Sequence, residues 1–462
     1  MRFVDRNKEK KRLEKFLSMP ESQLIVVYGR RRIGKSTLIR QVMESQRDVY
    51  FQADETNVAN QIAQLAKCIS FVKEGFDKVN YPDWDALLES LNHRIEEKLT
   101  LCLDEFPYLV KACPELPSIL QRFCDSKRSK FHIILCGSSQ QSMYAEVLNE
   151  SSPLYGRADC IMHLQPISVR FLGEAMGIDD PIDIIRHYSV WGGVPRYWQM
   201  CLNEGDFETS LKMLLLSPDG SLNEEPNRLL RDEMRDLMMS RSILSVIGAG
   251  ANRLSEIASR IGKNATELSV PIRRLLDMGF LEKEIPFGEN EKSSKHTLYK
   301  LRDPFMNAFY RFVAPNSSLI AMQKEEVVWN IVNSGLPQFE GECWERLCRE
   351  FVSGGIFNGV QFGKASRWWG SVYDDLLKEN RSIEIDVIAE SFDGKHLLVG
   401  ECKWTGADYA QRLLSELHSK VQLLPFAKKY KSVSYALFLK EKPLDNAADT
   451  LLFFPQDIVS NQ

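Results

Sequence analysis

A glycine-bounded loop near the amino end constrains the fold of this chain more than any other stretch. An apolar run at residues 24–28 precedes it, and residues 37–43 after it are competent to continue as a helix. The loop satisfies the pattern G-x-x-x-x-G-K-[ST], in which backbone N–H groups surround the phosphates of a nucleotide and the helix N-terminus adds a favourable dipole. We therefore expect a nucleotide site rather than a chance match in a turn. Its loop residues are Gly29, Arg30, Arg31, Arg32, Ile33, Gly34, Lys35 and Ser36.

Two carboxylates complete the pattern that such a loop requires. Asp104 and Glu105 follow an apolar stretch at residues 99–103. Lys35 is expected to contact the β- and γ-phosphates, and Ser36 to bind Mg²⁺. Asp104 would then hold the Mg²⁺ through water, and Glu105 would orient or deprotonate the attacking water. The alternative is a strand that is simply capped by two acids.

Two residues further along are candidates to contact the γ-phosphate. Ser138 follows an apolar strand at residues 131–137, and its hydroxyl is favoured over that of Ser139 as a phosphate sensor. Arg157 follows a loop and is a candidate arginine finger, acting on its own nucleotide or on that of a neighbouring molecule. An ordinary surface arginine is the alternative for Arg157.

Length and composition bound the remaining possibilities. The 462 residues are too many for one ordinary core, so we expect several domains. A net charge of −4 excludes a generally cationic protein, so any contact with nucleic acid requires a local basic surface. The ten cysteines form no C-x-x-C pair and no zinc spacing. With no secretory signal or long apolar run in sight, this composition predicts a cytoplasmic protein with no membrane segment.

Together, these motifs and three others resemble the archaeal-type ATPases, which belong with the AAA+-like STAND class of P-loop ATPases. The three others are Phe3-Val4-Asp5-Arg6, Leu154-Tyr155-Gly156-Arg157 and Gly192-Gly193-Val194-Pro195. The resemblance implies ATP and Mg²⁺ as cofactors, and it implies that the first loop and Pro195 bracket the adenine. Arg6 and Glu9 would fix the first loop, although the family's Arg-Glu-x-Glu reads Arg6-Asn7-Lys8-Glu9 here. The nucleotide contacts so expected are Arg6, Gly29, Arg30, Arg31, Arg32, Ile33, Gly34, Lys35, Ser36, Thr37, Ser138 and Pro195.

The middle of the chain predicts three helices and a two-stranded hairpin, an arrangement typical of a winged helix-turn-helix. The strands are expected at residues 281–286 and 297–301. The third helix offers few basic residues to a DNA groove, namely Arg273 and Arg274. Because sequence-specific DNA binding usually needs a more basic surface, a role in domain packing is favoured. Pro271 either lies in the first turn of that helix after a Ser269 cap or breaks a longer helix. Residues 314–318 give the clearest linker signal.

Carboxylates and a lysine converge in the predicted carboxyl-terminal strands. Asp386 lies on a strand at residues 383–390, and Asp393-Gly394 predicts a hairpin turn into a second strand at residues 397–404. Side chains alternate along a strand, so Glu401 and Lys403 share a face and Asp386 is expected beside Glu401.

This arrangement, with Glu345 on a preceding helix, resembles the PD-(D/E)xK nuclease domain. The stretches Arg367-Trp368-Trp369-Gly370 and Gly400-Glu401-Cys402-Lys403-Trp404 resemble the version fused to archaeal-type ATPases. The resemblance implies that Asp386 and Glu401 hold Mg²⁺, that Lys403 assists formation of hydroxide, and that Glu345 supports the metal or the lysine. The alternatives are a solvated face of a strand, or a nuclease fold that has lost its activity.

These inferences predict a multidomain α/β protein. We expect a P-loop ATPase core with a parallel sheet at 1–165, a helical lid at 166–225, a winged helix-turn-helix at 226–318 and a PD-(D/E)xK nuclease-like domain at 319–462. The expected function is ATP hydrolysis coupled to Mg²⁺-dependent cleavage of DNA. The alternative is an ATP-dependent switch that binds nucleic acid or a protein partner without cutting. Homo-oligomers through the ATPase domain are a further expectation.

Overall fold

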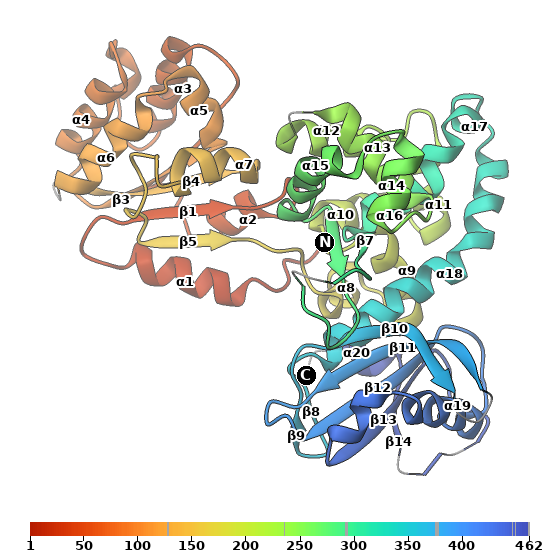
Figure 1. The fold of residues 1–462 in the computed structure, drawn as a ribbon. Coiled ribbons are helices and arrows are strands. Elements are labelled where there is room, and N and C mark those ends of the chain that lie inside the picture. Colours follow the sequence, from red (N-terminus) through yellow and green to blue (C-terminus); the bar gives the residue numbers. More distant parts are fainter. Residues whose placement is uncertain are drawn as a thin grey trace.

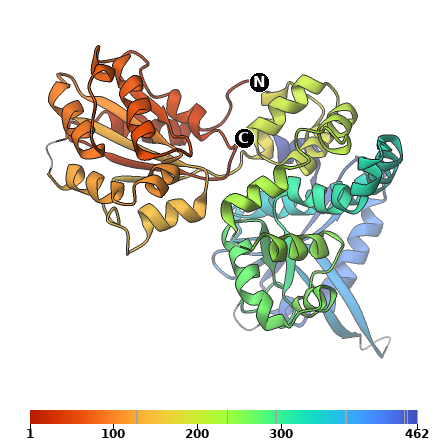
Figure 2. The ribbon, with the colours of Figure 1, turned by 90° about the horizontal axis from the view of Figure 1, so that it is seen from above.

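A computed structural model describes residues 1–126, 129–234, 236–291, 294–374, 378–445, 447–448 and 450–460. It separates the chain into an amino-terminal domain and a larger assembly of all later elements. Figures 1 and 2 show the amino-terminal domain, in red to orange, to one side of the green helices and the blue carboxyl-terminal sheet.

The amino-terminal domain is built on a five-stranded parallel sheet in the order β2-β3-β4-β1-β5. Residues of β1 alternate between the two cores on the faces of the sheet, with Leu24 and Val26 on one face and Ile25 and Val27 on the other. Burial on both faces explains why the three central strands β1, β3 and β4 are mainly apolar, as the sequence indicated. The strands are β1 (Leu24–Tyr28), β2 (Val49–Gln52), β3 (Leu99–Asp104), β4 (Phe131–Gly137) and β5 (Cys160–His163).

Helices cover both faces of this sheet (Figure 1). Leu13 of α1 and Leu38 of α2 pack on one face, whereas α3 to α6 supply the core of the other face. Asn57 and Asp83 cap α3 and α4 by accepting hydrogen bonds from backbone N–H groups, which fixes where these helices begin. The helices are α1 (Asn7–Leu17), α2 (Lys35–Arg40), α3 (Val58–Ser70), α4 (Trp84–Arg94), α5 (Phe106–Ala112), α6 (Leu116–Ser126) and α7 (Gln140–Met143).

The next four helices form the region predicted as a lid. A turn at Gly192–Gly193 separates α9 from α10, and Gly193 lies so close to Ile167 that an added Cβ would be 2.0 Å from its carbonyl oxygen. Only glycine fits there, because the turn packs directly against the backbone of Ile167. The helices are α8 (Leu172–Met176), α9 (Pro181–Trp191), α10 (Pro195–Glu204) and α11 (Phe207–Leu211).

Helices and a hairpin follow at the predicted positions in the middle of the chain. They are α12 (Glu225–Glu233), α13 (Leu237–Gly248), α14 (Leu254–Ile261), α15 (Ala265–Asp277), β6 (Leu281–Glu284) and β7 (Leu298–Leu301), with β6 and β7 antiparallel. Both expectations for Pro271 are wrong, because α15 begins at a capping box of Asn264 and Glu267 and continues through Pro271. The capping box stabilises the start of α15, and this outweighs the cost of a proline inside the helix.

The predicted linker at residues 314–318 is helical instead. Residues 314–316 form a single tight turn and Ser317 begins α17 (Ser317–Ala321), which follows α16 (Pro304–Ala308). The long helix α18 (Glu325–Val352) then leads into the carboxyl-terminal sheet. Small polar residues such as Ser317 and Ser318 occur in linkers and also at helix starts, so their composition alone did not distinguish the two.

The carboxyl-terminal sheet is mixed, with the strand order β10-β11-β12-β13-β14. β10, β11 and β12 are antiparallel neighbours, whereas β12, β13 and β14 run parallel. The Asp393-Gly394 turn joins β11 to β12 as predicted. The elements are β8 (Ile356–Phe357), β9 (Val360–Gln361), β10 (Ser366–Asp374), β11 (Glu379–Glu390), β12 (His396–Lys403), α19 (Ala410–Gln422), β13 (Ser432–Leu439), β14 (Thr450–Phe453) and α20 (Pro455–Val459).

One hydrophobic core continues from the lid to the carboxyl-terminal sheet. It includes Trp191 of α9, Leu244 of α13, Trp344 of α18 and Leu398 of β12. The sequence boundaries after residues 225 and 318 therefore do not coincide with gaps in packing. No helix among the described residues combines the length and apolar character needed to cross a membrane.

Candidate nucleotide and carboxylate sites

The phosphate loop joins β1 to α2 as the sequence predicted. Gly29 and Gly34 adopt positive φ angles of 150° and 93°, and a Cβ on Gly29 would lie 2.6 Å from the carbonyl oxygen of Leu164. The ammonium of Lys35 is buried and donates to the carbonyl oxygens of Gly29 at 2.8 Å and Arg30 at 3.1 Å. The lysine is therefore held inside the loop, where an anionic phosphate would meet it.

Ser36 and Asp104 face each other at the ends of α2 and β3. The Ser36 hydroxyl donates to Asp104 Oδ2 at 2.9 Å, and the Tyr50 hydroxyl contacts the same carboxylate. Burial and the nearby Asp104 raise the pKa of Tyr50, so the phenol stays a neutral donor. A hydroxyl and a carboxylate beside a phosphate loop are the oxygen donors that Mg²⁺ takes together with nucleotide phosphates, so the residues fit that ion.

Glu105 and Ser138 are brought together at the ends of β3 and β4. Ser138 donates to Glu105 Oε2 through its hydroxyl at 2.9 Å and its backbone N–H at 3.2 Å. Ser139 instead accepts a hydrogen bond from Ser142 N and caps α7. Of the two serines, Ser138 is thus the one beside the predicted catalytic glutamate.

The first loop and the lid reach the phosphate loop from two sides. Arg6 pairs with Glu9 at 3.0 Å and donates to the carbonyl oxygens of Ile33 and Gln165 at 3.4 and 2.6 Å. On the lid side, Pro195 Cγ lies 3.9 Å from the position of a Cβ on Gly34. The structure therefore brings Arg6 and Pro195 to the loop, as the resemblance implied.

Two arginine side chains of the loop, those of Arg30 and Arg32, bind carboxylates outside the amino-terminal domain. Arg30 forms an ion pair with Asp303, and it donates to the Tyr197 hydroxyl at 3.2 Å. Arg32 pairs with the fully buried Glu225 at 3.1 Å. These contacts tie the loop directly to α10, to α12 and to the segment between β7 and α16. A cavity of about 430 Å³ borders the loop here and is lined by Arg30, Arg31, Ile33, Ser138, Gly193, Val194, Glu233 and Asp303.

Arg157 does not reach the nucleotide of its own chain. Its guanidinium pairs with Asp125 at 2.8 Å, and both line a hollow with Gln23 and Leu24 at the start of β1. The phosphate loop leaves the opposite end of β1. An action of Arg157 on its own γ-phosphate is therefore wrong, because the chain between β4 and β5 returns to the amino-terminal ends of the parallel strands, away from the phosphate loop. Its action on a neighbouring molecule stays a prediction.

The carboxyl-terminal sheet places Asp386 opposite Glu401. The ladder between β11 and β12 pairs Val387 with Gly400, so Asp386 and Glu401 are the next facing positions. Asp386 Oδ2 accepts a hydrogen bond from Cys402 N at 2.8 Å. Burial, Glu401 and Glu345 raise the pKa of Asp386 to about 6, so both glutamates lie within electrostatic reach of Asp386.

Two lysines neutralise Glu401. Lys403 donates to Oε1 at 2.9 Å and Lys420 to Oε2 at 2.7 Å. Burial by itself would lower the pKa of Lys403, but Glu401 and Asp386 outweigh burial and raise it. Lys403 therefore remains an ammonium at neutral pH and is placed to stabilise negative charge beside the carboxylates.

The carboxylates do not form a closed metal cage. Across the described part of the chain, no group of three or more His, Cys, Asp or Glu side chains is arranged to hold a metal ion. Mg²⁺ usually binds through one or two carboxylates plus waters and substrate phosphates, so Asp386 and Glu401 are a sufficient donor set. The residues present fit an ion that arrives together with a phosphate-bearing substrate.

Several residues of both sites could not be found from sequence motifs. Tyr50 and Lys420 come from β2 and α19, which lie at no fixed spacing from Asp104 or Glu401. Arg349 donates to the backbone oxygen of Asp386 at 3.0 Å, one turn beyond Glu345 on α18. An arginine four residues after a glutamate on a helix was the available signal, but ordinary surface helices carry the same pair.

Comparisons with known proteins agree with this geometry at the amino end. Residues 3–200 match a family described as an ATPase domain predominantly from Archaea, and residues 309–414 match a family of archaeal and bacterial proteins of unknown function. An uncharacterized protein of Methanocaldococcus jannaschii, MJECL04, is 29% identical over 470 residues, covering 98% of this chain and 99% of its own length.

Among solved structures, the Walker-type ATPase PABY2304 of Pyrococcus abyssi is similar, with a TM-score of 0.53 and 23% identity. The similarity covers 67% of this chain and 96% of that one, and it shows a shared fold. The family match and the phosphate-loop geometry support ATP binding and hydrolysis by an archaeal-type ATPase domain at residues 3–200.

Proposed function

We propose that this protein is an ATP-controlled, Mg²⁺-dependent nuclease that acts on DNA through its carboxyl-terminal site. The observation that carries the proposal is the facing pair of Asp386 and Glu401, with Lys403 bound to Glu401. Two carboxylates and an ammonium at the end of paired strands are the groups that metal-assisted hydrolysis of a phosphodiester requires. The PD-(D/E)xK resemblance of the same residues supports this interpretation.

At the amino end, the residues divide the work of ATP hydrolysis. The backbone of residues 29–34 and the Lys35 ammonium bind the phosphates, while Ser36 and Asp104 would hold Mg²⁺. Glu105 is the general base, and Ser138 binds Glu105 until a γ-phosphate offers its hydroxyl another acceptor. The contacts of Arg30 and Arg32 with residues outside the amino-terminal domain support a regulatory use of this hydrolysis.

At the carboxyl end, Asp386 and Glu401 would hold Mg²⁺, and Glu345 lies close enough to support them electrostatically. When bound, the ion supplies a water of lowered pKa and charge for the phosphate oxygens. Lys403 contributes a second positive charge that favours hydroxide next to the scissile bond. Cys402 N holds Asp386 in position by donating to its carboxylate.

We interpret α13 to α15 with the β6–β7 hairpin as a winged helix used for packing. Its helices share the continuous core with the lid and α18, and its hairpin lines a cleft beside Asp386. Packing of this kind supports a mechanical link between the ATPase domain and the carboxyl-terminal site. Sequence-specific reading of DNA by Arg273 and Arg274 is not required.

A non-cleaving switch is the second candidate. It is favoured by Lys420, which occupies the second carboxylate oxygen of Glu401 and so competes with a metal ion. In this case the same cleft would bind nucleic acid or a protein partner, and ATP would control binding alone.

DNA cleavage in the presence of Mg²⁺ or Mn²⁺ tests the proposal. Asp386→Asn should abolish cleavage and leave ATP hydrolysis unchanged, because the variant alters one site only. Glu379→Gln, a loss of charge at an exposed position of the same strand, serves as the matched control and should cleave normally. Intact DNA under every metal and nucleotide condition would refute the nuclease and favour the switch.

A further inference from the structure

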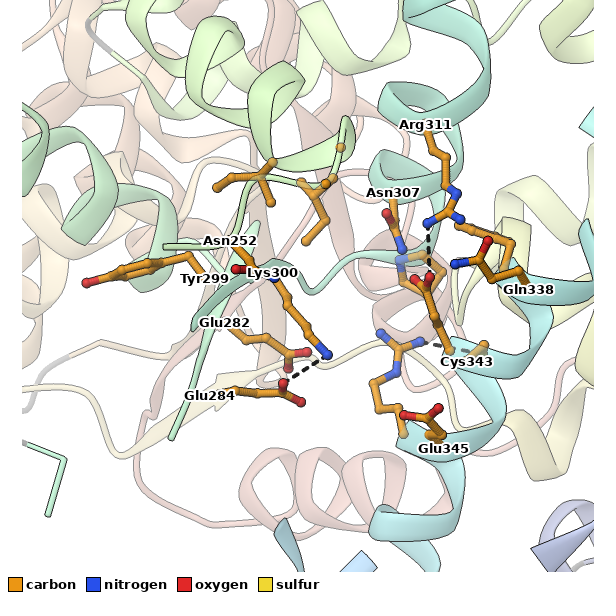
Figure 3. A pocket seen from close by; sticks show the side chains of 18 of the residues that line it. Asn252, Glu282, Glu284, Tyr299, Lys300, Asn307, Arg311, Gln338, Cys343 and Glu345 are labelled. Atoms are coloured by element: carbon orange, nitrogen blue, oxygen red, sulfur yellow. Dashed lines mark hydrogen bonds and ion pairs between the residues drawn. The ribbon is translucent and has the colours of Figure 1, made fainter. Parts of the chain in front are cut away.

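A cleft of about 650 Å³ opens beside the carboxyl-terminal carboxylates, between the β6–β7 hairpin and α18. Figure 3 shows Glu284 and Lys300 of the hairpin across the cavity from Glu345 of α18. Asp386 also lines this cleft. A substrate that reaches Asp386 from this side therefore has to pass the hairpin.

Glu284 of the hairpin gathers three cations in the cleft. It pairs with Lys300 at 2.9 Å, with Arg349 of α18 at 3.5 Å and with Arg367 of β10 at 3.4 Å. The side chains of Glu284, Arg349 and Arg367 are only 15%, 12% and 14% exposed. A carboxylate from one element thus holds two arginines that belong to the carboxyl-terminal domain.

The charge on Glu284 is stabilised by these neighbours. Burial would raise the pKa of Glu284, but Lys300, Arg349 and Arg367 outweigh burial and lower it. Glu284 is therefore a full anion at neutral pH. A phosphodiester group also carries one negative charge and accepts hydrogen bonds from guanidinium groups.

The two arginines lie next to the proposed cleavage site. Arg349 donates to the backbone oxygen of Asp386 at 3.0 Å and approaches Glu345 at 3.7 Å. Arg367 also pairs with Glu384, two residues before Asp386 on β11. Both guanidinium groups line the cleft. Arg349 lies one helical turn from Glu345, and Arg367 contacts the strand that carries Asp386, so a phosphate bound to them would lie beside these carboxylates.

We propose that Arg349 and Arg367 form a phosphate-binding subsite for a polynucleotide, and that Glu284 closes this subsite by occupying it as an internal anion. The inference rests on the proposed function, since it names the substrate contact and the regulation of the same site. Glu284 replaces the phosphate charge for charge and contacts both arginines, whereas Glu345 and Glu384 each contact one of them. The structure is then an autoinhibited state.

The hairpin also connects this subsite to the phosphate loop. Lys300 of β7 pairs with Glu284, and Asp303 lies three residues after Lys300 and pairs with Arg30 of the loop. A nucleotide that changes the position of Arg30 would also move Asp303, and with it β7, whose Lys300 pairs with Glu284. Nucleotide binding is therefore the event expected to withdraw Glu284 from the arginines.

The test is DNA affinity, measured by fluorescence anisotropy with a short labelled duplex over a series of salt concentrations. Glu284→Gln in the full chain should bind DNA about tenfold more tightly than wild type, because a like charge no longer opposes the phosphate. Its affinity should also fall more steeply with salt, since two more arginines now contact phosphates. Glu291→Gln, an exposed carboxylate of the same hairpin, should behave as wild type.

Arg349→Ala combined with Glu284→Gln should remove the gain in affinity, which separates the subsite from a general change in charge. If Glu284→Gln does not fold, Glu284→Asp, which retains the charge but shortens the side chain, should give a smaller gain. Equal affinities for wild type and both Glu284 variants would overturn the inference. A gain in affinity without any cleavage would leave the subsite standing and refute the proposed nuclease instead.

Discussion

Glu105 is the side chain on which the proposed ATPase chemistry depends most. It follows Asp104 at the end of β3 in a left-handed backbone conformation with φ of 54°, which turns its carboxylate toward Ser138. Glu105→Gln should retain ATP binding but reduce turnover by about 10²-fold or more, because a general base contributes that much to such reactions. The check is steady-state phosphate release alongside nucleotide affinity, and unchanged turnover would show that another group is the base.

His132 provides a pH-dependent test of the amino-terminal sheet, at the strand ends opposite the phosphate loop. It is buried in β4, where its Nδ1 accepts from Gln23 N at 3.2 Å and its Nε2 has no partner. Burial and Lys98 lower its pKa to about 4, from an ordinary value of about 6.5. The folded state therefore disfavours the protonated ring.

The lowered pKa of His132 makes the stability of the folded state depend on pH. The folded state is most stable above about pH 6.5, where the ring is neutral, and it loses stability as the pH falls toward 4, because the unfolded state binds the proton more readily. The difference corresponds to about 3 kcal/mol of unfolding free energy. Urea unfolding between pH 7 and 4 should show a shallower loss of stability for His132→Gln than for wild type. Parallel curves would contradict the assignment.

Single residues also show the limits of sequence motifs. Lys35, Ser36 and Asp104 could be placed because the loop and the strand that carry them are defined by local pattern. Arg157 could not be placed, since its position depends on which end of the strands the chain has reached at that point between β4 and β5. Glu284 and Arg349 meet only through tertiary packing, and no spacing in the sequence records that contact.

Whole helices and strands were predictable where the apolar residues follow a clear pattern along the sequence. β1, β3 and β4 were predicted as apolar runs, and β11 and β12 were predicted from alternation and the Asp393-Gly394 turn. The short strand β5, which alternates between buried and exposed residues, was not predicted. Glu345 was expected on a helix, but the sequence did not indicate that this helix begins as early as Glu325. Its amino-terminal half contains Gly335 and Pro337, which normally argue against a helix interior. Packing against the lid and α17 outweighs those preferences.

Near the cleft, single carboxylates connect elements that are far apart in the sequence. Asp303 caps α16 through Met306 N at 2.8 Å and also pairs with Arg30 of the phosphate loop. Glu284 ends β6 and holds arginines of α18 and β10. The β6–β7 hairpin and the segment that follows it therefore contact both the phosphate loop and the carboxyl-terminal site, each time through a carboxylate that pairs with an arginine.

Considered as a whole, the molecule combines a separate ATPase core with a larger body that shares one hydrophobic core. Burial inside that body makes its parts move together, whereas the contacts with the phosphate loop are mainly ionic. These pairs are largely buried, so a nucleotide can displace one of them only by offering the arginine another anion, which its phosphates do. The domain boundaries predicted from sequence missed this organisation because composition does not reveal which cores merge.

The most direct measurement is the rate of DNA cleavage with and without ATP, compared for wild type, Lys35→Ala and Asp303→Asn. If nucleotide binding at the phosphate loop controls the carboxyl-terminal site, ATP should change the wild-type rate by about 5- to 150-fold, the usual range of coupling between two sites. Lys35→Ala should lose the dependence because it cannot bind the phosphates, and Asp303→Asn should lose it while still binding ATP. An identical rate with and without ATP in wild type, or an unchanged ATP effect in Lys35→Ala, would contradict the coupling.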